Sequence, residues 1–193
     1  MEALIEEANR DGGLHFQLVN GQENAFAPLT IRYGKWVNVT NYIAVIGKKA
    51  DDLEERCGYY GEKIVLWAQT AGLKTGWVET GYTVRPDALE IAEDETLVLS
   101  IAIGYSEESG RAHKVKSVEE LSTVKGDMPD WFLRGMEYAA LAPSAGNQQL
   151  YNIRWDGETL SVTTKQGLLE HVDVGIAKYH FEVGSGINHA KWF

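Results

Sequence analysis

The sequence predicts an α+β fold in which helices flank a mixed, mainly antiparallel sheet. Three observations lead to this prediction: a proline-free helical segment over 51–73, dense apolar runs at 42–47 and 96–105, and an Asp156-Gly157 pair between two strand-like segments. Asp-Gly favours tight turns, so a hairpin is expected there. A chain of 193 residues, 44% of them hydrophobic, can bury the core of one domain or of two closely fused halves.

The first half of the chain should begin with a helix followed by a strand. Residues 2–9 are typical of a helix that ends at Gly12-Gly13, because glycine readily adopts the left-handed conformation that closes helices. Residues 14–19 alternate apolar and polar side chains, which is the period of a half-buried strand. The denser apolar run at 42–47 suits the middle of a sheet.

The long helix over 51–73 should pack one wide apolar stripe against a core. The stripe recurs at three- and four-residue spacing through Leu53, Cys57, Tyr60, Ile64, Trp67, Ala68 and Ala71. Gly58 and Gly61 interrupt the helix at a cost of about 1 kcal/mol each relative to alanine, which indicates close packing there. Cys57 lies on the stripe, where a buried structural thiol is the common outcome.

The remaining elements are predicted from turn signals and periodicity. We expect, in order, a short strand after Gly72, a helix over 86–92, a buried strand over 96–105, a short helix over 118–121, a helix from Pro129 to Leu141, strands over 151–155 and 159–164, and a last helix over 173–183. Aligning Gly61 with Gly175 also pairs Gly72 with Gly186, which is compatible with two related halves.

Composition excludes several classes of partner and site. The chain has 18 basic and 28 acidic residues and a formal charge of -10, so its mean field repels nucleic acid and anionic membranes. A single cysteine, Cys57, rules out an internal disulfide and a cysteine-only zinc site. The first 20 residues lack the pattern of a signal peptide, and no apolar run is long enough to span a bilayer. We therefore expect a soluble, cytoplasmic protein.

The most informative segment is Pro-Ser-Ala-Gly-Asn-Gln-Gln at 143–149, between a helix and a strand. Ser144, Asn147, Gln148 and Gln149 could present hydroxyl and amide groups to a planar, hydrogen-bonding ligand such as a flavin, because these groups both donate and accept hydrogen bonds. The same letters are also typical of a Ser or Asx turn that links a helix to a strand. On the sequence alone both interpretations stand.

Two further segments could complete such a site. In a strand-like stretch Lys114 and Lys116 would point to the same side and offer two ammonium groups to one phosphate. A solvated basic loop explains this run equally well. Residues 72–77 could lay a glycine-rich backbone along a flavin ring, or simply end the long helix and begin a strand.

Other catalytic schemes have less support. Gly104-Tyr105-Ser106 lacks the second glycine of a nucleophile elbow, which disfavours a serine hydrolase. The five histidines show no metal-binding pairing. Neither a Gly-x-Gly-x-x-Gly motif after a strand nor a Walker loop is present, so a dinucleotide-binding Rossmann fold is not predicted.

In their order and spacing, the segments 61–78, 142–149 and 173–181 resemble the nitroreductase family of flavin enzymes, most closely its single-chain members with two fused half-domains. The resemblance implies a nitroreductase-like fold over 1–193, with half-domains of about 1–125 and 126–193. Two departures are evident: the chain has no Arg-x-Ser-x-Arg segment, so the first helices of the family are expected to be absent, and Gln149-Leu150-Tyr151 stands where the family often has Gln-Pro-Trp.

The resemblance also implies an activity: hydride transfer from NAD(P)H, through FMN, to a nitroaromatic or quinone-like acceptor by a ping-pong mechanism. No side chain acts as a catalyst and no metal is implied, because the flavin carries the chemistry. The residues implied in FMN binding are Pro143, Ser144, Asn147 and Gln148 at the flavin, Thr75, Gly76, Trp77 and Val78 along its ring, and Arg111, Lys114 and Lys116 at its phosphate.

Two alternatives remain open at this point. A catalytically weak or inactive relative could keep the fold and bind flavin poorly, because the phosphate-gripping segment of the family is missing. A plain interaction protein could use the six tryptophans and the acidic surface for a protein partner. The expected assembly is a monomer or a homodimer.

Overall fold

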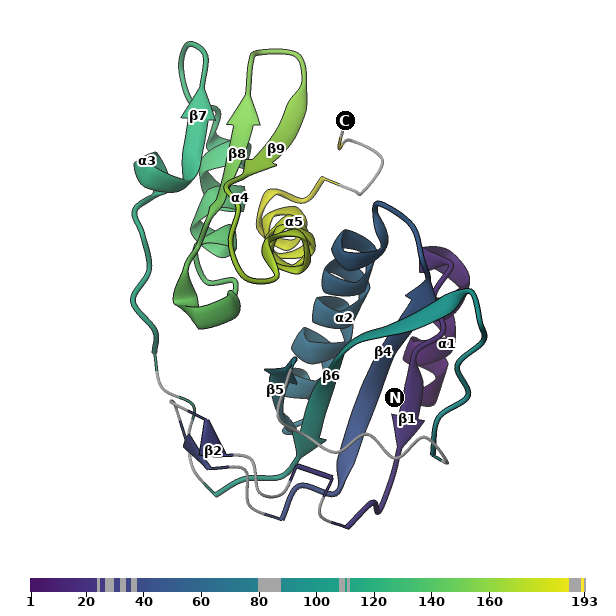
Figure 1. The fold of residues 1–193 in the computed structure, drawn as a ribbon. Coiled ribbons are helices and arrows are strands. Elements are labelled where there is room, and N and C mark those ends of the chain that lie inside the picture. Colours follow the sequence, from purple (N-terminus) through teal and green to yellow (C-terminus); the bar gives the residue numbers. More distant parts are fainter. Residues whose placement is uncertain are drawn as a thin grey trace. The chain divides into compact units, whose positions relative to one another are not determined.

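The computed structural model describes residues 1–23, 25–26, 30–31, 34–35, 38–79, 88–107, 110, 112–187 and 192. Its contacts divide the chain into two compact units (Figure 1), Met1–Leu53 with Lys63–Ser109 and Glu54–Glu62 with Gly110–Phe193. These units are defined by contacts and not by similarity between two halves. The division into related half-domains near residue 125 therefore stays a prediction.

The first unit is built on a four-stranded antiparallel sheet in the order β1-β4-β6-β5. Its strands are β1 (Gln17–Val19), β4 (Asn41–Lys48), β5 (Lys74–Val78) and β6 (Glu95–Gly104). A separate pair joins β2 (Thr30–Ile31) to β3 (Gly34–Lys35). Strand β4 is buried on both faces from Tyr42 to Gly47, as its dense apolar run predicted. Side chains of β4, β5 and β6 form a core with Phe26 and Leu89.

Helix α1 (Glu2–Gly12) ends as predicted, with Gly13 in the left-handed conformation at a φ of 59°. The strand that follows is shorter than the predicted 14–19. Before it, Leu14 forms an isolated bridge to Gly47, and the amide of His15 donates to the carbonyl of Ile46 at 2.8 Å. At Phe16 the side-chain amide of Asn9 binds both backbone groups: Nδ2 donates to the carbonyl at 3.0 Å, and Oδ1 accepts from the amide at 2.6 Å.

The helix predicted over 86–92 is wrong for 89–92, which are not helical, and residues 86–87 lie outside the described part. The side chain of Gln17 explains why these residues are not helical. Its Nε2 donates to the carbonyl of Glu90 at 2.5 Å, and its Oε1 accepts from the amide of Glu90 at 3.0 Å. Both backbone groups are therefore unavailable for a helical turn.

The second unit contains α3 (Val118–Leu121), α4 (Asp130–Ala139), a 3-10 turn η2 (Ala145–Asn147) and α5 (Glu170–Ser185). Its sheet joins β7 (Ser122–Val124) in parallel to β8 (Tyr151–Trp155), which pairs antiparallel with β9 (Leu160–Thr164). The predicted hairpin is confirmed: Gly157 has a φ of 104°, and Asp156 Oδ1 accepts from the amides of Glu158 and Thr159. Helix α5 begins three residues before the predicted start.

Helix α2 (Leu53–Thr70) contributes Glu54–Glu62 to the second unit, where these residues pack closely against α5. A Cβ on Gly58 would lie 2.1 Å from the carbonyl oxygen of Val172, so the absence of a side chain permits this crossing, as the sequence indicated. Polar pairs then link the helices: Lys178 Nζ to Glu55 Oε1 at 2.5 Å, and His180 Nε2 to Glu62 Oε1 at 2.9 Å. Cys57 is fully buried, as predicted.

Candidate functional site

The Pro-Ser-Ala-Gly-Asn-Gln-Gln segment forms a tight polar turn between α4 and β8. Gly146, Asn147 and Gln149 all have positive φ angles, of 57°, 56° and 48°. This conformation is easy for glycine and tolerable for asparagine, but unfavourable for glutamine. Hydrogen bonds hold it: Ser144 Oγ accepts from the amide of Gln149 at 3.0 Å, and Gln148 Nε2 donates to the carbonyl of Ala145 at 2.9 Å.

The turn is joined to the basic segment 114–116, which precedes it by about thirty residues in the chain. The carbonyl of Lys114 accepts from Asn147 Nδ2 at 3.0 Å and from Gln149 Nε2 at 2.8 Å. The amide of Lys116 donates to Gln149 Oε1 at 2.8 Å. Residues 114–116 and 144–149, joined by these bonds, are named the polar junction below. The two segments predicted to share a site are thus brought together.

Gln149 is the central residue of the polar junction. The residue is only 3% exposed, and its side chain makes hydrogen bonds to Lys114, Lys116 and Asn147. A buried amide needs such partners, since an unpaired one would cost about 1–3 kcal/mol. The segment is therefore a hydrogen-bonded turn between a helix and a strand, and the side chains of Asn147 and Gln149 also anchor the basic segment.

The two lysines differ in what their ammonium groups do. Lys116 Nζ donates to the backbone carbonyls of Gln148 and Gln149, at 2.8 and 2.7 Å. Lys114 is exposed, and within the described part of the chain its ammonium has no partner. One lysine thus closes the turn while the other faces solvent. Arg111, the third cation predicted at the phosphate, lies outside the described residues.

Asp173 supports the turn from α5. The amide of Ala145 donates to both carboxylate oxygens, at 3.0 and 3.1 Å. Asp173 is 3% exposed, and this burial raises the pKa of its carboxyl to about 7 although the bond from Ala145 opposes the shift. The group therefore changes charge near neutral pH. Sequence reasoning did not single out Asp173, and its place in the first turn of a predicted helix is the one signal that could have pointed to it.

The four residues predicted along the ring lie on β5, in the first unit. Thr75, Gly76 and Trp77 are half-buried, whereas Val78 belongs to the core of the sheet. Strand β5 is at the edge of its sheet and pairs only with β6 among the described strands.

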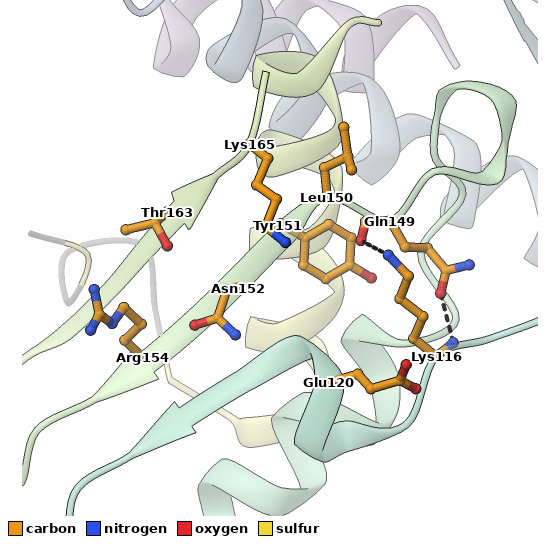
Figure 2. A pocket seen from close by; sticks show the side chains of 9 residues that line it. All are labelled: Lys116, Glu120, Gln149, Leu150, Tyr151, Asn152, Arg154, Thr163 and Lys165. Atoms are coloured by element: carbon orange, nitrogen blue, oxygen red, sulfur yellow. Dashed lines mark hydrogen bonds between the residues drawn. The ribbon is translucent and has the colours of Figure 1, made fainter. Parts of the chain in front are cut away.

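A pocket of about 290 Å³ opens beside the polar junction, within the second unit. Figure 2 shows the side chains that line it: Lys116, Glu120, Gln149, Leu150, Tyr151, Asn152, Arg154, Thr163 and Lys165. Three of them are basic and one is acidic. Sequence reasoning found only Lys116 and Gln149. The alternation of polar residues along 152–154 and 163–165 was the signal that could have revealed Arg154 and Lys165.

Two classes of feature are not found in the described part of the chain. No group of three or more His, Cys, Asp or Glu side chains there is placed to hold a metal ion. No helix there has the length and apolar character that crossing a membrane requires.

The chain was compared with known proteins. Residues 1–185 match the model of a family described as "Putative TM nitroreductase". A "putative nitroreductase" from Thermotoga maritima is 21% identical, with 93% of this chain and 73% of that chain covered and a TM-score of 0.64. An "FMN-dependent Nitroreductase" from Clostridium difficile is 17% identical, with 59% and 81% covered and a TM-score of 0.42. No curated protein matches. The first structure confirms the α+β, nitroreductase-like fold.

Proposed function

Because the chain belongs to the TM nitroreductase family, we propose that it is an FMN-dependent oxidoreductase that uses NAD(P)H to reduce nitroaromatic or quinone-like acceptors. Membership of the family supports an oxidoreductase in general. The donor, the acceptors and a ping-pong order are the finer parts of the proposal, as is a cytoplasmic location.

The observation that carries the proposal is the polar junction. Two segments that were predicted to hold one flavin are joined by direct hydrogen bonds through Lys114, Asn147 and Gln149. If they were unrelated turns of the surface, nothing would require them to meet. Their contact supports a common site that includes Ser144, Gln148 and Lys116.

The groups left unused by the polar junction suit an FMN phosphate. The ammonium of Lys114 is exposed, and Lys116 keeps one of its three N–H donors after binding two carbonyls. Hydrogen bonds from cations to phosphate are short and strong. The donor set therefore fits the cofactor.

Bound FMN would supply the redox chemistry, by accepting a hydride from the nicotinamide and passing it to the acceptor. The chain's own residues bind and orient. Lys114 attracts the negatively charged phosphate in a protein whose net charge of -10 would otherwise repel it. Ser144 and Gln149 keep the turn in a conformation that positive φ angles make unfavourable. The hydrogen bonds within the turn limit its motion.

One observation favours a second candidate, a family member that binds flavin weakly. The side-chain amides of Asn147, Gln148 and Gln149 are already hydrogen-bonded within the chain. They would gain little from a ligand, because a new bond replaces one that exists. Under this alternative the polar junction is only a structural link between 114–116 and β8.

A visible spectrum of the purified chain tests the proposal. Bands near ~370 and ~450 nm, the ordinary signature of oxidised flavin, are expected after incubation with FMN. NAD(P)H should bleach them, and a quinone should restore them. Protein that stays colourless in excess FMN would refute the proposal. Lys114→Ala should weaken FMN binding by roughly tenfold, whereas Lys125→Ala, an exposed lysine in the same unit, should leave it unchanged.

A further inference from the structure

The pocket beside the polar junction lies on the open face of the β8–β9 hairpin (Figure 2). Asn152 pairs with Thr163, and the amide of Lys165 donates to the carbonyl of Leu150. Since side chains alternate along a strand, Asn152 and Arg154 share one face with Thr163 and Lys165. The other face carries buried residues such as Ile153, so the open face is free for a ligand.

Two of the three cations in the pocket are unused. Arg154 and Lys165 are exposed, and their side chains make neither a hydrogen bond nor an ion pair with any other described residue. Lys116 contributes charge, although two of its donors are taken by carbonyls. The single acidic group, Glu120, accepts from the amide of Ser117 in a capping box at 2.9 Å. The pocket is therefore a basic spot in a chain of charge -10.

Neutral donors complete the lining. The hydroxyl of Thr123 donates to Asn152 Oδ1 at 2.8 Å, which occupies the amide oxygen and leaves the NH2 group without a partner in the described chain. The hydroxyl of Thr163 is likewise without one. Guanidinium, ammonium and amide NH2 groups only donate, so these groups suit a ligand that accepts hydrogen bonds. A phosphate monoester is such a ligand, and arginine binds it with two parallel bonds.

We propose that this pocket binds the phosphate group of a small phosphate monoester, held chiefly by Arg154 and Lys165. Its volume of about 290 Å³ suits a phosphate group with part of a small molecule attached. Two sources share this chemistry. The phosphate is either that of FMN, in which case this inference rests on the proposed function, or that of a separate phosphorylated metabolite.

Binding of inorganic phosphate at constant ionic strength tests the pocket itself. Isothermal titration should give affinities for Arg154→Gln and Lys165→Gln that are each lower than wild type by roughly tenfold. Arg134→Gln is the matched control, because Arg134 is exposed on α4 of the same unit and does not line the pocket. Glu120→Gln should bind phosphate several-fold more tightly, since it removes a negative charge while glutamine can keep the capping box.

Equal phosphate affinity in Arg154→Gln, Lys165→Gln and Arg134→Gln would overturn the proposal, as would the lack of any phosphate binding by the wild-type chain. Melting curves without phosphate show whether each variant is folded, so a loss of binding is not mistaken for unfolding.

FMN and riboflavin, which differ by the phosphate, then separate the two sources. If the phosphate is that of FMN, Arg154→Gln weakens FMN binding and leaves riboflavin binding unchanged. If it belongs to another metabolite, Arg154→Gln alters neither flavin but weakens ribose 5-phosphate binding. Both outcomes support the pocket. A wild-type chain that binds inorganic phosphate but no FMN would contradict the proposed function alone.

Discussion

Replacing Gly175 with alanine tests whether α2 and α5 require a position without a side chain where they cross. A Cβ on Gly175 would lie 2.0 Å from the carbonyl oxygen of Glu55 and 2.6 Å from the backbone nitrogen of Tyr59. Ordinary contacts of a Cβ begin near 3.4 Å. Because both neighbours are backbone atoms, no side-chain rotation relieves the clash, and the helices have to separate by roughly 1 Å or more.

The cost follows from three contributions. Overpacking costs typically about 1–3 kcal/mol. Separation also lengthens the bonds from Lys178 to Glu55 and from His180 to Glu62, each worth about 1.5–3 kcal/mol when intact and only partly lost. The higher helix propensity of alanine offsets about 1 kcal/mol of this loss of stability. The free energy of unfolding should therefore fall by about 2–4 kcal/mol.

Urea denaturation followed by circular dichroism measures this loss. Gly110→Ala is the control, because no atom of the described residues lies within 4 Å of its added Cβ and its φ is not in the left-handed region. Gly58→Ala should be destabilised to a similar extent, since its Cβ meets the carbonyl of Val172 at 2.1 Å. The double variant should lose less than the sum, because one separation relieves both clashes. A Gly175→Ala midpoint equal to that of Gly110→Ala would refute the reasoning.

Two further predictions concern buried titratable groups. Burial raises the pKa of Asp173 to about 7, against about 3.9 in an unfolded chain. Between these two pH values the folded state holds a proton that the unfolded chain has lost. This group therefore lowers the free energy of unfolding as pH rises from about 4 to about 7, and it causes no further loss above pH 7. Asp173→Asn should remove that part of the slope in melting temperature, and an unaltered slope would contradict the assignment. Burial likewise raises the pKa of Cys57 to about 12, so a thiol reagent at pH 8 should label it only after denaturant is added; rapid labelling of the native chain would show that the thiol is accessible.

The fold was predictable where local signals determine it. Glycines at the end of α1, the apolar run of β4 and the Asp-Gly pair of the hairpin each specify a conformation over a few residues. The sequence patterns missed bonds between a distant side chain and the backbone. Asn9 binds both backbone groups of Phe16, and Gln17 binds both backbone groups of Glu90, where a helix was predicted. A sequence pattern does not reveal which polar side chain reaches which backbone group.

The candidate site was predictable in its parts but not in its connections. The Pro-Ser-x-x-Asn-x-Gln segment was singled out because its residue types favour turns and hydrogen bonds. Its link to Lys114 spans 33 residues, and periodicity carries no information about such a contact. Arg154 and Lys165 were missed for a different reason: charged residues on a strand most often face water, and only the pocket distinguishes these two.

The polar junction separates two tasks, building the turn and binding a ligand, that the sequence assigned to the same residues. Gln149 is buried with its amide fully engaged, so a ligand would have to break existing bonds to use it. The cationic groups of Lys114, Arg154 and Lys165 are exposed and have no hydrogen-bond partner within the described chain. Recognition of an anion should thus depend on residues outside the motif, while the motif fixes the backbone around them. Substitutions of the cations should change affinity without changing stability, because their side chains hold no part of the fold.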